Sequence, residues 1–346
     1  MKQYLLPEKG NFYKACLHVH STCSDGVVTP QDIKTMYMEK GYSIVAYTDH
    51  EVIVPHNDLR DENFLPITGA EIAVNESIPG LSWRYGKQYH LNLLSKDPNK
   101  NETSVFTMSY VCYDASLPYI TEKMKATEYP REYNNECVND IIRRAREEGF
   151  LVTFNHPVLS GQSYPDYIEL DGLWGIEVHN TGSVTNGHFD TVQPFVDLVK
   201  SGKRVFPLAT DDMHGVSNAF GGWVMVKAQS LDYGTVMDAL EKGDFYASTG
   251  PEIRALYLED EVLTVECSEA SAVMVRTERH VSKFQQQQDA PLTRVSFDLH
   301  DYLAGSFEKN MPYEPYFRVA VLDAAGKFAY TRAYFLDEIS GLPYQK

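Results

Sequence analysis

The sequence has little positive charge, few cysteines and no long apolar run. Its 31 lysine and arginine residues stand against 48 aspartate and glutamate residues, which leaves a net charge of −17. Because such a surface repels polyanions, we expect neither a nucleic-acid polymer nor a membrane among its partners. A small phosphorylated substrate is compatible with this charge if bound divalent cations set the local field.

The five cysteines are scattered and contain no CxxC pair. This pattern favours reduced thiols in a cytoplasmic protein over a disulfide framework. No run of about 18 apolar residues occurs, so we expect no transmembrane helix, and residues 1–15 lack the apolar core of a secretion signal. Serine-hydrolase (GxSxG) and P-loop (GxxxxGKS/T) motifs are absent as well.

Short apolar runs alternate with helical patterns over residues 1–252. Thr29 and Pro30 have the character of an N-cap and first helical residue, and Gly41 that of a helix end. Further helices are predicted at about 135–148, 189–200 and 232–242, which together with the apolar runs indicates a mostly parallel α/β fold. Residues 253–346 alternate at period two, which predicts a small all-β sandwich-like domain without helices.

Potential metal ligands recur where the apolar runs end. In a barrel of parallel strands these ends meet at one mouth, so the ligands are expected to converge there. His90 differs because it opens its strand. Mixed nitrogen and oxygen donors favour two or three Zn, Mn or Fe ions over Ca or Mg. The nine candidate ligands are His18, His20, Asp25, His50, Glu71, His90, His156, Asp212 and His214.

These residues resemble the ordered motifs of the PHP (polymerase and histidinol phosphatase) superfamily. Residues 18–26, HVHSTCSDG, are similar to its HxHTxxSDG opening, and the later motifs follow in the family's order over roughly residues 12–250. The resemblance implies a distorted (β/α)7 TIM-like barrel, bound divalent ions and hydrolysis of phosphate esters. A loosely similar β-sandwich follows the barrel in some of these phosphoesterases.

The resemblance also divides the candidate ligands into three metal sites, with Glu71 as the bridge between the first and the second. Asp212 rather than Asp211 is the expected ligand because the family spacing is Asp-x-His. Asp25 stands near a position where some members have a histidine, so the third site depends on it. The implied groups are His18, His20, Glu71 and Asp212; then Glu71, His90 and His156; then Asp25, His50 and His214.

In the expected reaction, a hydroxide bridging two metals about 3.5–4 Å apart attacks phosphorus in line. Glu71, Asp25 and His214 would act catalytically by holding these metals. His188 is a weaker candidate for protonating the leaving group. Small nucleotides or sugar phosphates are the expected substrates.

Residues 79–135 form a long insertion rich in tyrosine and arginine. Its aromatic side chains could stack on a base while Arg84 or Arg131 grips a phosphate; ordinary packing of the insertion is the alternative. Glu177 and His179 follow another apolar run. They could support a metal ligand or contact the substrate, and pure packing is again the alternative.

Two other functions compete with the phosphoesterase hypothesis. A metal-dependent amidohydrolase shares the HxH motif and a barrel, but the combination of Asp25, Glu71 and Asp212-x-His214 favours PHP. A non-catalytic, metal-stabilised PHP module is the second alternative. Such modules usually lack some ligands, whereas this sequence retains the full set.

Overall fold

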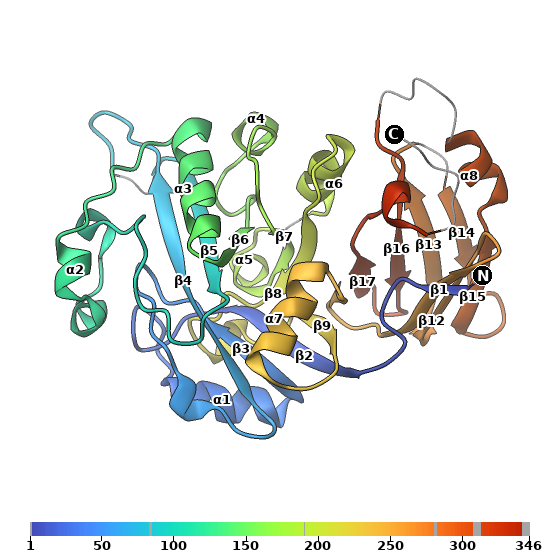
Figure 1. Cartoon of the computed structure of the whole chain (residues 1–346), viewed down its shortest axis with the longest axis horizontal. Helices are drawn as coiled ribbons and strands as arrows, with labels where there is room; N and C mark the ends of the chain where they lie inside the picture. The colour runs from blue at the N-terminus through green and yellow to red at the C-terminus, as the bar shows by residue number, and fades with distance from the viewer. Residues whose placement is uncertain (1, 83–84, 190, 280–281, 307–312, 341–346) are drawn as a thin grey trace.

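The computed structural model describes residues 2–82, 85–189, 191–279, 282–306 and 313–340 (Figure 1). The chain is mixed α/β, with a 14-stranded and a 4-stranded sheet. Within the described residues, no helix is long and apolar enough to cross a membrane.

Seven consecutive strands form the part of the large sheet that carries the candidate ligands. Their sheet order follows the chain. The strands are β2 (Asn11–Val19), β3 (Tyr42–Tyr47), β4 (Leu65–Asn75), β5 (Gln88–Ser95), β6 (Phe150–Phe154), β7 (Gly175–Asn180) and β8 (Phe206–Thr210). An isolated parallel bridge between Val19 and Met213 also brings the end of β2 beside the residues that follow β8.

The mostly parallel sheet expected from the sequence is right only for part of this region. β2, β3 and β4 are parallel, as are β6, β7 and β8, but β5 runs antiparallel to both β4 and β6. Most other strand pairs in the described chain are antiparallel too. The reversal of β5 explains the exceptional position of His90. The start of an antiparallel strand lies beside the ends of its neighbours, where His90 pairs with Ala73 of β4.

The four longer helices near these strands lie where the sequence predicts, with one difference at the start of α6. The side chain of Thr29 accepts a hydrogen bond from the amide of Asp32 at the start of α1 (Pro30–Glu39). α3 (Asn135–Glu147) buries one apolar stripe, α6 (Gln193–Lys200) begins a few residues later than expected, and α7 (Tyr233–Lys242) ends at left-handed Gly243. Three short helices are α2 (Glu122–Lys125), α4 (Tyr164–Tyr167) and α5 (Thr181–Thr185).

The large sheet continues in antiparallel fashion from β2 into the C-terminal part of the chain (right-hand side of Figure 1). These strands are β9 (Trp223–Ala228), β10 (Phe245–Ser248), β17 (Phe328–Thr331), β16 (Tyr316–Leu322), β13 (Ala272–Thr277) and β14 (Ser282–Gln286), with β18 (Tyr334–Phe335) beside β16. The smaller sheet contains β1 (Lys2–Tyr4), β11 (Ile253–Glu259), β12 (Val262–Ala270) and β15 (Leu292–Asp298). The N-terminal strand β1 therefore belongs to the sheet built by C-terminal strands.

A separate hydrophobic core contains buried residues of the smaller sheet and of the C-terminal strands of the large sheet, together with Leu5 and Leu6. The prediction of no helix after residue 252 is wrong, because α8 (His300–Ser306) follows β15. Leu299, Tyr302 and Leu303 are buried at helical spacing, but the turn is too short for a clear sequence pattern. The division of the chain at residue 252 stays a prediction.

Candidate metal centre

The nine side chains named as candidate ligands converge at or after the ends of β2, β3, β6 and β8, within β4 and near the start of β5. They form three groups in which the potential ligand atoms lie within 4.8 Å of one another. These groups are His18, His20, Glu71 and Asp212; Glu71, His90 and His156; and His20, Asp25, His50 and His214. The grouping matches the one implied by the family resemblance, with His20 as an additional member of the third group.

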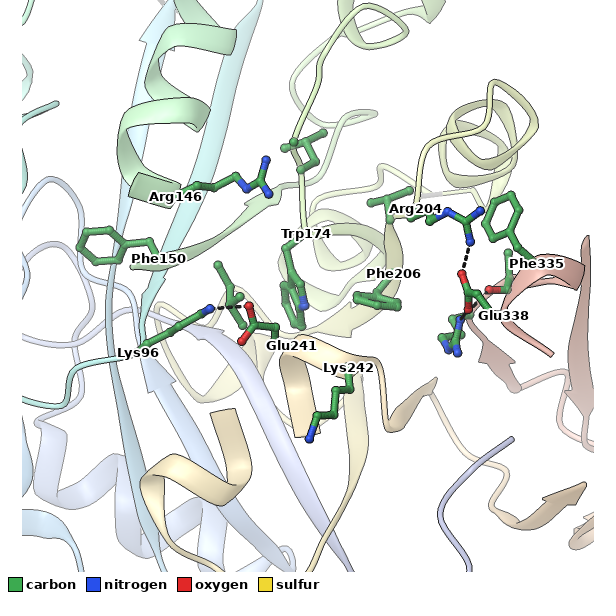
Figure 2. Close-up of a pocket in the computed structure, with 16 residues that line it drawn as sticks. Lys96, Arg146, Phe150, Trp174, Arg204, Phe206, Glu241, Lys242, Phe335 and Glu338 are labelled. Carbon is green, nitrogen blue, oxygen red and sulfur yellow. Dashed lines mark hydrogen bonds and ion pairs between the residues drawn. The ribbon is translucent and has the colours of Figure 1, made fainter. Parts of the chain in front are cut away.

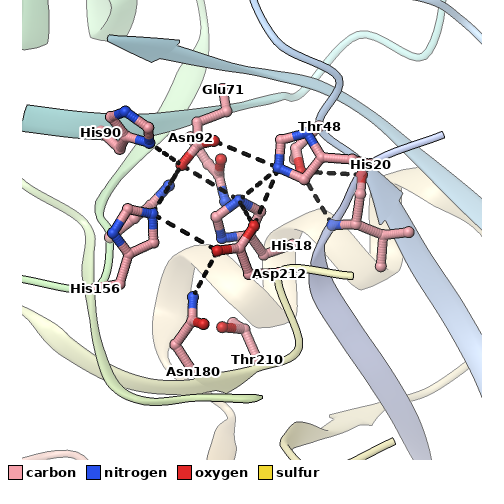
Figure 3. A network of polar contacts seen from close by, with 12 residues as sticks. His18, His20, Thr48, Glu71, His90, Asn92, His156, Asn180, Thr210 and Asp212 are labelled. Atoms are coloured by element: carbon pink, nitrogen blue, oxygen red, sulfur yellow. Dashed lines mark hydrogen bonds and ion pairs between the residues drawn. The ribbon is translucent and has the colours of Figure 1, made fainter. Parts of the chain in front are cut away.

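The first group is the most deeply buried and contains acceptor atoms facing one another (Figure 3). His18 Nε2 lies 3.1 Å from His20 Nε2 and 3.2 Å from Asp212 Oδ1. Glu71 Oε1 is 3.3 Å from the same nitrogen of His18, and Glu71 Oε2 is 3.4 Å from His20 Nε2. Four side chains, carried by or following β2, β4 and β8, thus point potential ligand atoms at one place, an arrangement that suits a metal ion.

The outer nitrogens of three histidines are held by hydrogen-bonding groups. His18 Nδ1 lies 2.8 Å from the carboxylate of Glu177, which can only accept, so the ring proton sits on Nδ1 and the Nε2 lone pair faces the cluster. His214 Nδ1 lies 3.0 Å from the carbonyl oxygen of Asp212 and is fixed in the same way. His156 Nδ1 contacts Ser160 Oγ at 3.0 Å. Such outer contacts orient histidines that bind metals.

Glu177 contacts the residues around the cluster with both of its carboxylate oxygens. Oε1 accepts from His18 Nδ1 and, at 2.6 Å, from Thr210 Oγ1. Oε2 accepts from the backbone N–H of His156 and from Asn180 Nδ2, both at 2.8 Å. Burial raises the pKa of Glu177, but the charge of His18 outweighs it and the net shift is downward. Glu177 therefore stays anionic and fixes His18, which agrees with the hypothesis that it supports a ligand.

The second and third groups extend from Glu71 toward the surface. Glu71 Oε1 lies 3.2 Å from His90 Nδ1 and 3.3 Å from His156 Nε2. Asp25 Oδ2 lies 3.2 Å from His214 Nε2 and 3.5 Å from His50 Nε2. The third group is the more exposed of the two.

The carboxylates strongly perturb the protonation of these histidines. Burial lowers the pKa of His20, but hydrogen bonds to Asp212 and Glu71 outweigh it and raise the value to about 10. The same opposition raises the pKa of His156 to about 9. Burial and the neighbouring charge of His20 instead lower the pKa of His50 to about 3. A cluster that attracts protons this strongly offers the same lone pairs to a cation.

Two of the candidate ligands have unusual backbone conformations. His156 has φ +26° and Asp212 has φ +52°, although neither is glycine. Residues other than glycine adopt such angles at some cost, and they occur preferentially at functional sites. Here they turn the side chains at the ends of β6 and β8 toward Glu71.

Asp211 is excluded from the cluster, as the Asp-x-His spacing predicts. Its buried carboxylate accepts hydrogen bonds from the backbone N–H groups of Phe220, Gly221 and Gly222, and from Tyr37 Oη at 2.8 Å. A Cβ on Gly222 would lie 2.7 Å from the backbone oxygen of Thr210, so this turn requires glycine. The turn at residues 220–223 therefore anchors the loop that carries Asp212, a role that sequence reasoning missed.

Three of the predicted substrate-binding and proton-donating residues are described, and none of them belongs to the three ligand groups. The Arg131 side chain is buried and forms a two-pronged ion pair with Glu51 at 2.7 and 2.8 Å, so its charge is already matched, and its role in binding phosphate stays a prediction. His179 contacts Thr181 Oγ1 and the ring of Phe328 instead of the cluster. His188 is exposed, with no contact to the cluster among the described residues. Arg84 lies outside the described residues.

A pocket of about 320 Å³ borders the cluster and includes His50 and His90 in its lining. Tyr110 and Tyr113 of the insertion also line it, and the Tyr113 ring stacks on His50 with 5.7 Å between ring centroids. This pocket is the candidate space for a substrate, and it brings part of the predicted aromatic insertion beside the cluster.

A larger pocket of about 560 Å³ contains none of the nine candidate ligands (Figure 2). Its basic side chains are largely engaged, since Lys96 pairs with Glu241 and Arg204 pairs with Glu338. This cavity is larger than the one beside His50, but its lining contains no group of side chains comparable to the metal-ligand cluster.

Residues 17–156 match the model of the PHP domain family, which confirms the resemblance. A 5'-3' exoribonuclease from Haemophilus influenzae is 24% identical over 159 residues, 44% of this chain and 55% of that protein. The chain thus spans about half the length of this curated relative.

Two solved structures are also similar. A two-domain protein from Bacteroides vulgatus, described as containing a PHP-like metal-dependent phosphoesterase, is 14% identical with a TM-score of 0.46. The match covers 96% of this chain and 98% of that one. A metal-dependent phosphoesterase from Bifidobacterium adolescentis is 16% identical with a TM-score of 0.39. It covers 68% of this chain and 96% of its own.

Proposed function

Because residues 17–156 of the chain are a PHP domain, we propose that the protein is a metal-dependent phosphoesterase acting on a small nucleotide or sugar phosphate. The observation that carries this proposal is the inward-facing set of lone pairs on His18, His20 and Asp212 around Glu71. Without a cation, these acceptor atoms would face one another at 3.1–3.4 Å unless extra protons lay between them.

Further polar atoms fit a bound cation. Asp212 Oδ1, His20 Nδ1 and His90 Nδ1 are buried, and within the described part of the chain their contacts at 3.2–3.5 Å lack the geometry of a regular hydrogen bond. Such atoms are costly unless something satisfies them. The donors are imidazole nitrogens and carboxylate oxygens, which suit Zn, Mn or Fe. We propose two or three ions, held by the three groups defined above.

Bound divalent ions would supply Lewis-acid stabilisation of the phosphoryl charge and activate water for attack. The chain's own residues orient this chemistry. Glu177 fixes His18, and Asn155 Nδ2 donates to Glu71 Oε1 at 2.8 Å, which holds the proposed bridging carboxylate in place. Asp25 and His214 would act through the third, more exposed group. The pocket beside His50 would receive the remainder of the substrate.

We further propose that β2–β8 form the distorted seven-stranded barrel expected from the sequence. The bridge between Val19 and Met213 supports closure between the first and last of these strands. We also propose a catalytic domain over residues 1–252, with its insertion at about 79–135 interrupted by strand β5 of the barrel, and a β-sandwich-like domain over residues 253–346. The separate core of the C-terminal sheets supports this division.

The test compares one protein preparation across metals and substrates. Chelator-treated protein is reloaded with Mn, Zn or Fe, then assayed on 4-nitrophenyl phosphate, mononucleotides, sugar phosphates, a short oligoribonucleotide and an amide. We expect metal-dependent release of phosphate from small substrates. Because a relative is named an exoribonuclease, faster cleavage of the oligoribonucleotide would overturn the small-substrate proposal. Full activity of the chelated protein, or activity on the amide alone, would overturn the phosphoesterase proposal.

A further inference from the structure

A second kind of ligand cluster lies outside the nine residues already described. One potential ligand atom each from Cys23, Asp49 and His56 lies within 4.8 Å of the other two. All three residues are buried, with 3%, 1% and 8% of their surface exposed. Unlike the candidate metal centre, this group contains a thiol.

His56 has an unused nitrogen in this environment. Its Nε2 is buried and has no hydrogen-bond partner among the residues that the structure describes. The ring packs against Tyr47 with 4.5 Å between centroids, which fixes its position. Burial lowers the pKa of His56, although the charge of Asp49 opposes this shift. A neutral imidazole offers a lone pair to a metal.

The two other side chains also have capacity for a ligand. Cys23 Sγ contacts Tyr119 Oη at 3.2 Å. The Asp49 carboxylate accepts hydrogen bonds from Ser21 N, Ser21 Oγ and Ser24 Oγ, each at 2.8 Å. A carboxylate has about four acceptor positions, so these three bonds leave one for a cation.

We propose that Cys23, Asp49 and His56 form an additional site for a thiophilic divalent cation, with Zn²⁺ the best match. One sulfur, one nitrogen and one oxygen ligand suit a tetrahedral zinc ion, with water or the Tyr119 phenol in the fourth position. Binding replaces the thiol proton, which passes to solvent. The thiolate and the carboxylate then neutralise the charge of the dication in this buried setting.

The position of the cluster indicates a structural role beside the candidate metal centre. Ser116 Oγ, in the 3-10 helix at Asp114–Tyr119, donates to the backbone oxygen of Cys23 at 3.1 Å. Ser24 Oγ lies 2.8 Å from Asp49 Oδ1 and 3.2 Å from Asp25 Oδ1. A bound ion would therefore join the insertion to the loop that carries Asp25, and act as a positioning element for it.

Cobalt substitution tests this proposal independently of enzymatic activity. Full-length protein is stripped of metal and titrated with Co²⁺ while the near-ultraviolet spectrum is recorded. Only a thiolate ligand gives an intense sulfur-to-cobalt charge-transfer band, and the nitrogen and oxygen donors of the main centre give none. We expect this band in the wild type, its loss in Cys23→Ser, and one bound zinc fewer per chain in that variant by elemental analysis.

Matched variants decide which thiol is responsible. Cys267→Ser changes a buried thiol on β12 and should retain the band. Cys112→Ser should retain it as well, although Cys112 lines the pocket beside His50. Absence of the band in the wild type, its persistence in Cys23→Ser, or its loss in Cys112→Ser would overturn the proposal. If Cys23→Ser fails to fold, His56→Gln should weaken cobalt binding to the thiolate by at least tenfold; an unchanged titration would overturn it equally.

Discussion

Replacing Glu177 with glutamine would separate the outer support of the metal centre from its ligands. The substitution retains side-chain size but changes one acceptor oxygen into an N–H donor. Each oxygen of Glu177 accepts two hydrogen bonds. If the glutamine oxygen keeps His18 and Thr210, its NH₂ group must face the backbone N–H of His156 and the amide of Asn180. In either orientation, two buried donors lose their acceptor.

The expected cost follows from these contacts. Each buried donor left without a partner costs about 1–3 kcal/mol, and loss of the carboxylate also weakens the orientation of His18. Groups that orient metal-binding histidines typically affect metal affinity by about 10- to 100-fold. We therefore expect Glu177→Gln to weaken binding at the first metal group by that factor, while all proposed ligands remain present.

The assay is a competition titration of zinc against a chromophoric chelator, with thermal unfolding measured in parallel. Glu278→Gln is the matched control, because Glu278 is also a buried carboxylate that accepts from Tyr302 and Arg279 in the C-terminal part of the chain. It should lower stability and leave zinc affinity unchanged. Wild-type zinc affinity in Glu177→Gln, or an equal loss in the control, would refute the role given to Glu177.

Three further predictions address the ligands, a buried ion pair and acid stability. Asp212→Ala should remove at least one bound metal, measured by elemental analysis, and lower phosphoesterase turnover at least about 100-fold. An unchanged metal content together with undiminished hydrolysis of 4-nitrophenyl phosphate would contradict this prediction. Arg131→Met leaves Glu51 as an unpaired buried charge and should cost about 3–5 kcal/mol in urea unfolding, whereas adding Glu51→Gln should restore part of that loss. Burial and the nearby charge of Lys327 lower the pKa of His179 to about 4 in the folded state. As pH falls below about 6.5, His179 therefore becomes protonated in the unfolded state before it does in the folded state, and the folded state loses stability. His179→Gln should therefore reduce the stability lost between pH 7 and 5 by up to about 2 kcal/mol in urea titrations, and an unchanged acid dependence would contradict this.

The candidate ligands could be located from the sequence because their positions follow from local patterns. An apolar run that ends in a histidine or carboxylate places that side chain at a strand end, and parallel neighbours bring such ends together. His18 and His50 were found in this way, and so was Glu71, although β4 continues past it to Asn75. The reversal of β5 could not be inferred from a short apolar run, because the direction of a strand depends on distant partners. His90 was therefore identified by its residue type and by the family resemblance.

Arg131 has a partner that composition does not predict. An arginine in an insertion rich in aromatic residues suggests a phosphate-binding group, but its partner Glu51 is 80 residues away in the sequence. The pairing depends on how the insertion folds back onto the loop after β3, and no local pattern encodes that. In the structure, the charge of this arginine neutralises a buried carboxylate. The proposed metal ions would supply positive charge for a phosphate without it.

Glu177 and His179 have different roles that the sequence pattern could not distinguish. The two residues are two positions apart on β7, so strict alternation would point both side chains to the same face. The register against β8 shifts between them: Glu177 pairs with Leu208 and His179 with Ala209, so one extra residue stands in β7. Such a bulge reverses the alternation. Glu177 consequently faces His18, while His179 packs against Phe328. In an unbulged strand of the same residues, strict alternation would place His179 on the face of Glu177 and turn Asn180, whose side-chain amide now contacts both Glu177 and Asp212, to the other face. The bulge therefore allows two polar residues of one strand to serve the centre, Glu177 before the extra residue and Asn180 after it.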